Sequence, residues 1–137
     1  VKDITITNRT YHKALEVQSV FDVNVINFEK KYLAAAENDV IISATSAPHL
    51  VLTKEELLPL LNRDKKYTFL DLAMPRDIAP ELSSEENIDL FNLDDIWKVY
   101  NKNLKTRDEL MQSYSFLIDK QMVNLKKWFQ YYEERKI

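Results

Sequence analysis

The stretch DVIISAT, from Asp39 to Thr45, decides the fold that the sequence predicts. Its apolar residues Val40, Ile41 and Ile42 follow one another instead of alternating with polar residues. Such a run is typical of a strand that is buried on both faces, as in a parallel sheet with helices on either side. We therefore expect a parallel sheet, in which the loop SAPH follows this strand at residues 46–49.

Strands and helices are expected to alternate on both sides of this stretch. Four more runs have the composition of strands, at residues 3–7, 23–28, 67–72 and 88–93. Helices are expected at residues 11–21, 29–38 and 54–61. Thr10 and Thr53 are expected to cap the first and third of these helices, and Glu56 would complete a capping box with Thr53. The alternation predicts βαβ units and an α/β fold with a doubly wound parallel sheet.

The end of the chain has a different pattern, with neither proline nor glycine from residue 94 to residue 137. About thirty residues from Arg107 onward are expected to form one helix about 45 Å long. Its apolar residues recur at steps of three and four and form an apolar stripe. The stripe consists of Leu110, Met111, Tyr114, Leu117, Ile118, Met122, Leu125, Trp128, Phe129 and Tyr132.

A stripe of this length marks an interface if nothing in the same chain covers it. We therefore predict a homodimer that forms through this helix. The alternative is that the helix folds back and packs against its own domain. The predicted organisation is a sheet domain at residues 1–93, followed by a linker and the long helix at residues 94–137.

The composition narrows the classes of function. Apolar residues make up 45% of the 137 residues and the net charge is −3, which is ordinary for a globular chain and argues against a broad basic surface for nucleic acid. Cysteine is absent, which excludes disulfides, thiolate metal sites and thiol nucleophiles within the chain. Neither His12 nor His49 is spaced against a pair of carboxylates, so no metal site is expected. No signal peptide or transmembrane run is visible, and a cytoplasmic location is expected.

The loop after the first predicted strand carries Asn8, Arg9 and Thr10. In doubly wound sheets, ligands bind beyond the carboxyl ends of the strands. An arginine in this loop accommodates the 2′-phosphate of NADP, whereas an acidic residue favours NAD. These residues therefore predict an NADP(H) site, and the alternative is a surface turn with a solvated arginine.

Two further loops follow buried strands. Thr45, Ser46 and Ala47 could pass beside the ribose or nicotinamide of a cofactor, although threonine and serine also end strands for structural reasons alone. Arg76 and Asp77 follow the strand at residues 67–72, where they could pair with each other or with the backbone, and Arg76 could hold a carboxylate or phosphate. Asp71 lies inside an apolar run, so we expect it to be at least partly buried or hydrogen-bonded.

Four strings of residues together resemble the glutamyl-tRNA reductase family over nearly the whole chain. They are ITITNRT at residues 4–10, DVIISATSAPH at 39–49, DLAMPRDI at 71–78 and NLDDI at 92–96, with Asn103 and Arg107 beyond them. The resemblance implies an oxidoreductase that uses NADPH to reduce glutamyl-tRNA to glutamate-1-semialdehyde, the first committed step of one route to tetrapyrroles such as porphyrins. It also implies that a cysteine attacks the aminoacyl ester and that the resulting thioester receives the hydride.

The same resemblance implies that this chain holds only part of such an enzyme. The family's cysteine belongs to a preceding domain, and its first strand and glycine-rich turn come before the strand that contains Ile4. Glycine is absent from the chain, so no glycine-rich phosphate loop can form within it. We therefore expect an incomplete Rossmann-like sheet at residues 1–93, the start of the dimerisation domain at residues 94–137, and no catalytic residue.

On this interpretation the chain alone is inactive and binds NADPH weakly or not at all, because the pyrophosphate of a dinucleotide rests on the glycine-rich turn. Glutamyl-tRNA would be bound mainly by the rest of the enzyme. Two alternatives stay open, a non-catalytic oligomerisation or regulatory module and another NADP-dependent dehydrogenase of the same fold, such as one resembling shikimate dehydrogenase. The strings APH at 47–49 and MPRDI at 74–78 count against the second alternative.

Overall fold

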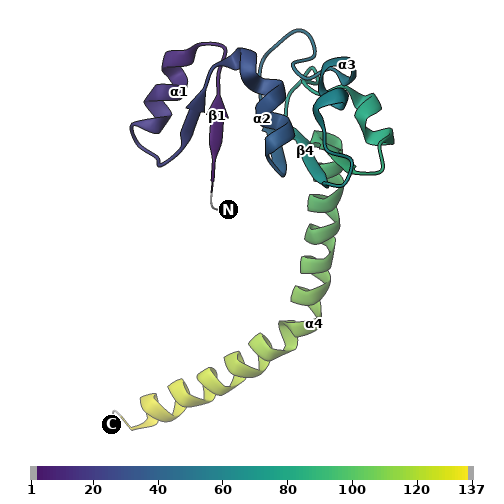
Figure 1. The fold of residues 1–137 in the computed structure, drawn as a ribbon. Helices are drawn as coiled ribbons and strands as arrows, with labels where there is room; N and C mark the ends of the chain where they lie inside the picture. Colours follow the sequence, from purple (N-terminus) through teal and green to yellow (C-terminus); the bar gives the residue numbers. More distant parts are fainter. Residues whose placement is uncertain (1–2, 136–137) are drawn as a thin grey trace. The chain divides into compact units, whose positions relative to one another are not determined.

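The computed structural model describes residues 3–135 and divides into two compact units, Val1–Leu93 and Asp94–Ile137. Figure 1 shows how strands and helices alternate in the first unit. The strands are β1 (Thr5–Thr7), β2 (Asn24–Ile26), β3 (Val40–Ser43), β4 (Tyr67–Asp71) and β5 (Ile88–Asn92). The α-helices of this unit are α1 (Tyr11–Gln18), α2 (Lys31–Glu37) and α3 (Lys54–Leu57). Three 3-10 helices are η1 (Phe28–Lys30), η2 (Leu58–Leu60) and η3 (Pro80–Ser84).

Every strand pair in the described sheets is parallel, so the predicted α/β fold with parallel strands is confirmed. The strands form two sheets, one with the order β1-β2 and the other with the order β3-β4-β5. Thr7 lies opposite Ile26 in the first sheet, and Ser43 lies opposite Asp71 in the second. The loops that follow these strands therefore leave each sheet at its carboxyl edge.

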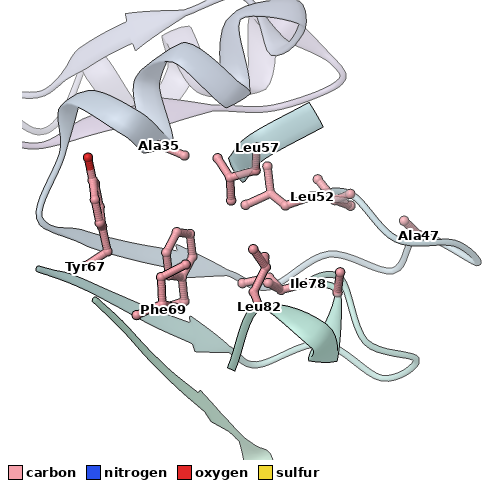
Figure 2. Close-up of a cluster of buried hydrophobic side chains, with 11 residues drawn as sticks. Ala35, Ala47, Leu52, Leu57, Tyr67, Phe69, Ile78 and Leu82 are labelled. Atoms are coloured by element: carbon pink, nitrogen blue, oxygen red, sulfur yellow. The ribbon is translucent and has the colours of Figure 1, made fainter. Parts of the chain in front are cut away.

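The core lies on one face of the β3-β4-β5 sheet, and Figure 2 shows its side chains between the sheet and the elements above it. Tyr67 and Phe69 point from β4 into this cluster. The hydroxyl of Tyr67 accepts a hydrogen bond from the backbone N–H of Asn62 and donates one to the carbonyl of Ala36, both at 3.0 Å. A buried tyrosine needs such partners, and these two bonds tie β4 to the end of α2 and to the segment that follows η2.

The prediction that β3 is buried on both faces is wrong. Val40 and Ile42 are 56% and 61% exposed, whereas Ile41 is half-buried and Ser43 is buried. Phe91 of β5 lies on the same open face and is also exposed. A run of apolar residues indicates that both faces of a strand suit an apolar environment. In the described chain only one of these faces is covered.

The predicted helix caps are only partly correct. Thr10 and Thr53 occupy N-cap positions with extended backbone, but neither hydroxyl accepts a hydrogen bond from a backbone N–H of its helix. The hydroxyl of Thr53 lies 3.3 Å from that of Tyr32 and 3.4 Å from Oε2 of Glu56, so the predicted capping box does not form. Tyr32 and Glu56 are both close to the hydroxyl of Thr53, and a capping motif read from neighbouring residues does not reveal the contact with Tyr32.

The second unit consists of one helix, α4 (Leu93–Glu134), which has 42 residues and is drawn from green to yellow in Figure 1. It begins at Leu93, so the predicted linker before Arg107 is wrong. Asp94 and Asp95 lie in the first turn, where acidic side chains favour a helix start, and no proline or glycine interrupts the residues that follow. At 1.5 Å per residue the helix is about 63 Å long. Residues 136–137 of the predicted helix lie outside the described part of the chain.

All members of the apolar stripe are exposed in α4, and the described helix has no buried residue. No helix within residues 3–135 is both long enough and apolar enough to cross a membrane.

Candidate functional site

The loop Asn8–Thr10 follows β1 at the carboxyl edge of its sheet. Oγ1 of Thr7 donates a hydrogen bond to the carbonyl of Ile26 at 3.1 Å, which joins the ends of β1 and β2. Oδ1 of Asn8 accepts a hydrogen bond from the backbone N–H of Thr10 at 2.8 Å, so the asparagine side chain closes an Asx turn over residues 8–10. Asn8 therefore gives the loop its shape, and that shape presents the exposed side chain of Arg9 beside the start of α1.

Arg9 lies near a cluster of aromatic and basic side chains that follows β2. Its guanidinium carbon is 5.7 Å from the centre of the Phe28 ring, and Nζ of Lys31 is 4.8 Å from the same centre. Nζ of Lys31 also lies 4.4 Å from the centre of the Tyr32 ring. The negative face of an aromatic ring attracts cations at such distances. One ring at the carboxyl edge of the β1-β2 sheet therefore has both cations near it.

Neither of these cations takes part in an ion pair within residues 3–135. The ion pairs found there join Lys54 to Glu85, Lys65 to Asp39 and Lys98 to Asp95. The charges of Arg9 and Lys31 are therefore available to an anion. Arg9 was predicted from the sequence, whereas Phe28 and Lys31 were not. The string FEKKY at residues 28–32, in which two aromatic residues flank a glutamate and two lysines directly after a strand, is the signal that could have revealed them.

The second predicted loop is held by Asp77, whose side chain is 0% exposed. Its Oδ2 accepts hydrogen bonds from Oγ of Ser43 at 2.7 Å and from the backbone N–H of Thr45 at 2.8 Å. Its Oδ1 accepts the hydroxyl of Thr45 at 2.6 Å. The hydroxyl of Thr45 in turn accepts the backbone N–H of Ala47 at 3.1 Å. One carboxylate therefore sets the path of the chain from the end of β3 to Ala47.

A second buried carboxylate, Asp71, holds Asp77 in place. Asp71 is 1% exposed, which confirms that it is buried and hydrogen-bonded within its apolar strand. Its oxygens accept the backbone N–H groups of Ala73, Asp77 and Ile78 at 3.0 to 3.1 Å. Both carboxylates are thus satisfied by hydrogen-bond donors, as buried polar groups require. They connect the ends of β3 and β4 in a single network.

The side chains of Arg76 and Asp77 have different surroundings. Arg76 is exposed, and the carboxylate of Asp77 binds Ser43 and Thr45, so the suggestion that Arg76 and Asp77 pair with each other is wrong. Ser46 is exposed in the loop, whereas Ala47 is buried and belongs to the core cluster. Only the backbone of Ala47 could therefore face a ligand.

Ser43 was not predicted from the sequence, nor was the role of Asp77 as the residue that holds this loop. A polar residue at the end of an apolar strand was the available signal, but its partner lies 34 residues away. His49 is exposed beyond the loop. The described residues contain no cluster of three or more histidine, cysteine, aspartate or glutamate side chains that could hold a metal ion.

The chain is similar to known proteins over most of its length. Residues 1–99 match the family model of shikimate / quinate 5-dehydrogenase. The chain is 48% identical over 134 residues to the glutamyl-tRNA reductase of Fusobacterium nucleatum subsp. nucleatum, a match that covers 97% of this chain and 41% of that protein. It is 37% identical over 128 residues to the glutamyl-tRNA reductase of Thermosipho melanesiensis, covering 93% of this chain and 33% of that protein.

Solved structures give the same result. The glutamyl-tRNA reductase from Methanopyrus kandleri superposes with a TM-score of 0.87 at 25% identity, over 99% of this chain and 35% of that one. The nucleotide-binding domain of glutamyl-tRNA reductase from Thermoplasma volcanium has a TM-score of 0.61 at 23% identity, over 78% of this chain and 69% of that one, and supports the fold alone. The chain spans less than half the length of the curated relatives described above.

Proposed function

Because this chain belongs to the shikimate / quinate 5-dehydrogenase family, and because it is similar to glutamyl-tRNA reductases over nearly its whole length, we propose that it is the NADP-binding and dimer-forming part of a glutamyl-tRNA reductase. The proposed reaction of the whole protein is the reduction of glutamyl-tRNA to glutamate-1-semialdehyde with NADPH, in tetrapyrrole biosynthesis. The family match ends at residue 99, whereas the similarity to the reductases covers 97% of the chain. That difference favours a reductase of this kind over another dehydrogenase of the same family.

The observation that carries the proposal is the pair of loops at the carboxyl ends of β1 and β3. Arg9 has no ion-pair partner within the described residues and lies at the edge where doubly wound sheets bind ligands, so it fits the 2′-phosphate of NADPH. Asn8 and Thr10 would shape this end of the site. Thr45, Ser46 and the backbone of Ala47 would line the cofactor further along, held by Asp77.

The sheet topology supports a further part of the proposal, that another segment of the enzyme completes the site. The common doubly wound sheet has the strand order 3-2-1-4-5-6. Strands β1 to β5 of this chain would correspond to the second to sixth strands of such a sheet. The first strand of that fold would then lie between β1 and β3, which belong to separate sheets here. A strand and a glycine-rich turn at that position would bind the pyrophosphate, for which this glycine-free chain has no suitable loop.

The residues of this chain would bind and orient the cofactor, which supplies the hydride when it is bound. Asp71 and Asp77 are buried and their oxygens already accept hydrogen bonds, so we assign them to shaping the loops rather than to proton transfer. The nucleophile would belong to another part of the enzyme, because the chain has no cysteine.

The whole enzyme tests this proposal directly. Arg9→Ala in the complete protein is expected to raise KM for NADPH about tenfold, because one charge-assisted contact to a phosphate is lost. The value of kcat should change little, since Arg9 is far from the transferred hydride in this proposal. Glutamate-1-semialdehyde formed from glutamyl-tRNA is the quantity to measure. Absence of this product with NADPH, or an unchanged KM in the variant, would contradict the proposal.

The isolated chain provides a second prediction. Without a glycine-rich turn it should bind NADPH with a Kd weaker than about 100 μM, because the two pyrophosphate charges lack their main binding groups. Isothermal titration calorimetry on the 137-residue chain measures this constant. Binding at micromolar Kd or tighter would show that the described loops are sufficient by themselves, against the prediction.

A further inference from the structure

The side chain of Lys31 lies in an unusual position for a lysine on a short surface helix. Its ammonium is within 5 Å of two ring centres, 4.8 Å from that of Phe28 and 4.4 Å from that of Tyr32. Lys31 is half-buried, whereas its neighbour Lys30 is exposed. A lysine with a free choice of conformation extends its charge into water. Here the rings hold the charge near the surface of the loop.

The position of Tyr32 is itself restrained. Its hydroxyl lies 3.3 Å from the hydroxyl of Thr53 and accepts the backbone N–H of Thr53 at 3.3 Å. This contact ties the start of α2 to the residue before α3. The aromatic wall beside Lys31 is therefore attached to the core of the first unit rather than to a loose loop.

Arg9 reaches the same Phe28 ring from the loop after β1, at 5.7 Å. Parallel pairing of Thr7 with Ile26 brings the two loops together, and Oγ1 of Thr7 reinforces it with its hydrogen bond to Ile26. Two like charges at one ring repel each other unless an anion lies between or beside them. The described residues offer no carboxylate in an ion pair with either charge.

We propose that Lys31, held against Phe28 beside Arg9, is a second phosphate-binding cation of this loop and helps to select a 2′-phosphorylated adenosine over an unphosphorylated one. The inference rests on the proposed function, because it takes the anion to be the 2′-phosphate of an NADP-type cofactor. A phosphomonoester carries up to two negative charges and three acceptor oxygens, which suits one guanidinium and one ammonium together. Phe28 is a positioning residue in this arrangement, since it acts through the two cations.

The isolated chain can test this inference, because 2′-AMP contains the adenosine 2′-phosphate and lacks the pyrophosphate. Titration of ¹⁵N-labelled chain with 2′-AMP is expected to shift the amide resonances of Arg9 and Lys31 in a saturable way. Lys31→Ala should weaken the Kd about fivefold, the size expected of one partly exposed charge pair. Lys31→Arg should restore most of the affinity, and a higher salt concentration should reduce it.

Lys30→Ala is the matched control. It removes the same charge from the neighbouring residue, whose side chain is exposed. It should leave the Kd for 2′-AMP within about twofold of the native value, since an exposed charge at this distance is largely screened. Binding of 5′-AMP should be clearly weaker than binding of 2′-AMP. Equal binding of the two nucleotides, or equal effects of the Lys30 and Lys31 substitutions, would overturn the inference.

The outcomes separate this inference from the proposed function. If Arg9→Ala weakens 2′-AMP binding and Lys31→Ala does not, the role of Lys31 is refuted while the cofactor loop stands. If 2′-AMP shifts no resonance in residues 8–10 of the native chain, both the role of Lys31 and the assignment of this loop to the cofactor are refuted.

Discussion

Asp77→Ala is expected to lower the free energy of unfolding of the first unit by about 4 kcal/mol, because three hydrogen bonds to a buried carboxylate are lost together. The substitution leaves the hydroxyl of Ser43 and the backbone N–H of Thr45 without their acceptor. Ser43 is buried, so water replaces that acceptor poorly. A loss of this size is a large fraction of the total stability of a small domain.

Native-state hydrogen exchange of the β4 amides is the suitable measurement, because it reports on the first unit separately from α4. Asp77→Asn should lose only about 1 kcal/mol, since its amide oxygen can still accept the Thr45 N–H while the amide nitrogen donates to the Thr45 hydroxyl. Asp64→Ala removes an exposed carboxylate from a turn and serves as the control, with an expected change of less than about 0.5 kcal/mol. If Asp77→Ala behaves like Asp64→Ala, the network does not hold the loop.

The second large effect is expected in the apolar stripe of α4. We propose that the chain forms a homodimer through this stripe, whose central residues Leu117, Ile118, Met122 and Leu125 are all exposed. Replacing Ile118 and Leu125 with glutamate places two charges in that surface. The dimer dissociation constant should rise more than about a hundredfold, because central apolar contacts dominate such interfaces and a buried unpaired charge is strongly unfavourable.

Sedimentation equilibrium is the direct measurement. The native chain, of 16.2 kDa, should sediment as a dimer at micromolar concentration, and the double variant as a monomer. Gln112→Glu combined with Gln130→Glu adds the same charge at exposed polar positions outside the stripe and should leave the dimer intact. A native chain that remains monomeric at high micromolar concentration would refute the proposed dimer.

Several features of this protein could be predicted from short stretches of sequence. The apolar runs at β3 and β4 predict parallel strands, and the alternation around them predicts the βαβ order. The spacing of three and four between apolar residues predicts the long helix, although it placed the start near Arg107 rather than at Leu93. These features depend on the spacing of apolar residues along a strand or helix, which can be read from residues close together in the sequence.

The tertiary structure alone decided which side chains meet. Asp77 binds Thr45 from 32 residues away, and Lys31 joins Arg9 at Phe28 only because β1 and β2 pair in parallel. It also decided that Val40 and Ile42 face outward although their sequence suits burial. A pattern along the chain gives the preference of each residue for a strand or helix. The register of the strands and the cover on each face depend on distant residues, and these determine where the charges, hydroxyls and carboxylates of the site finally lie.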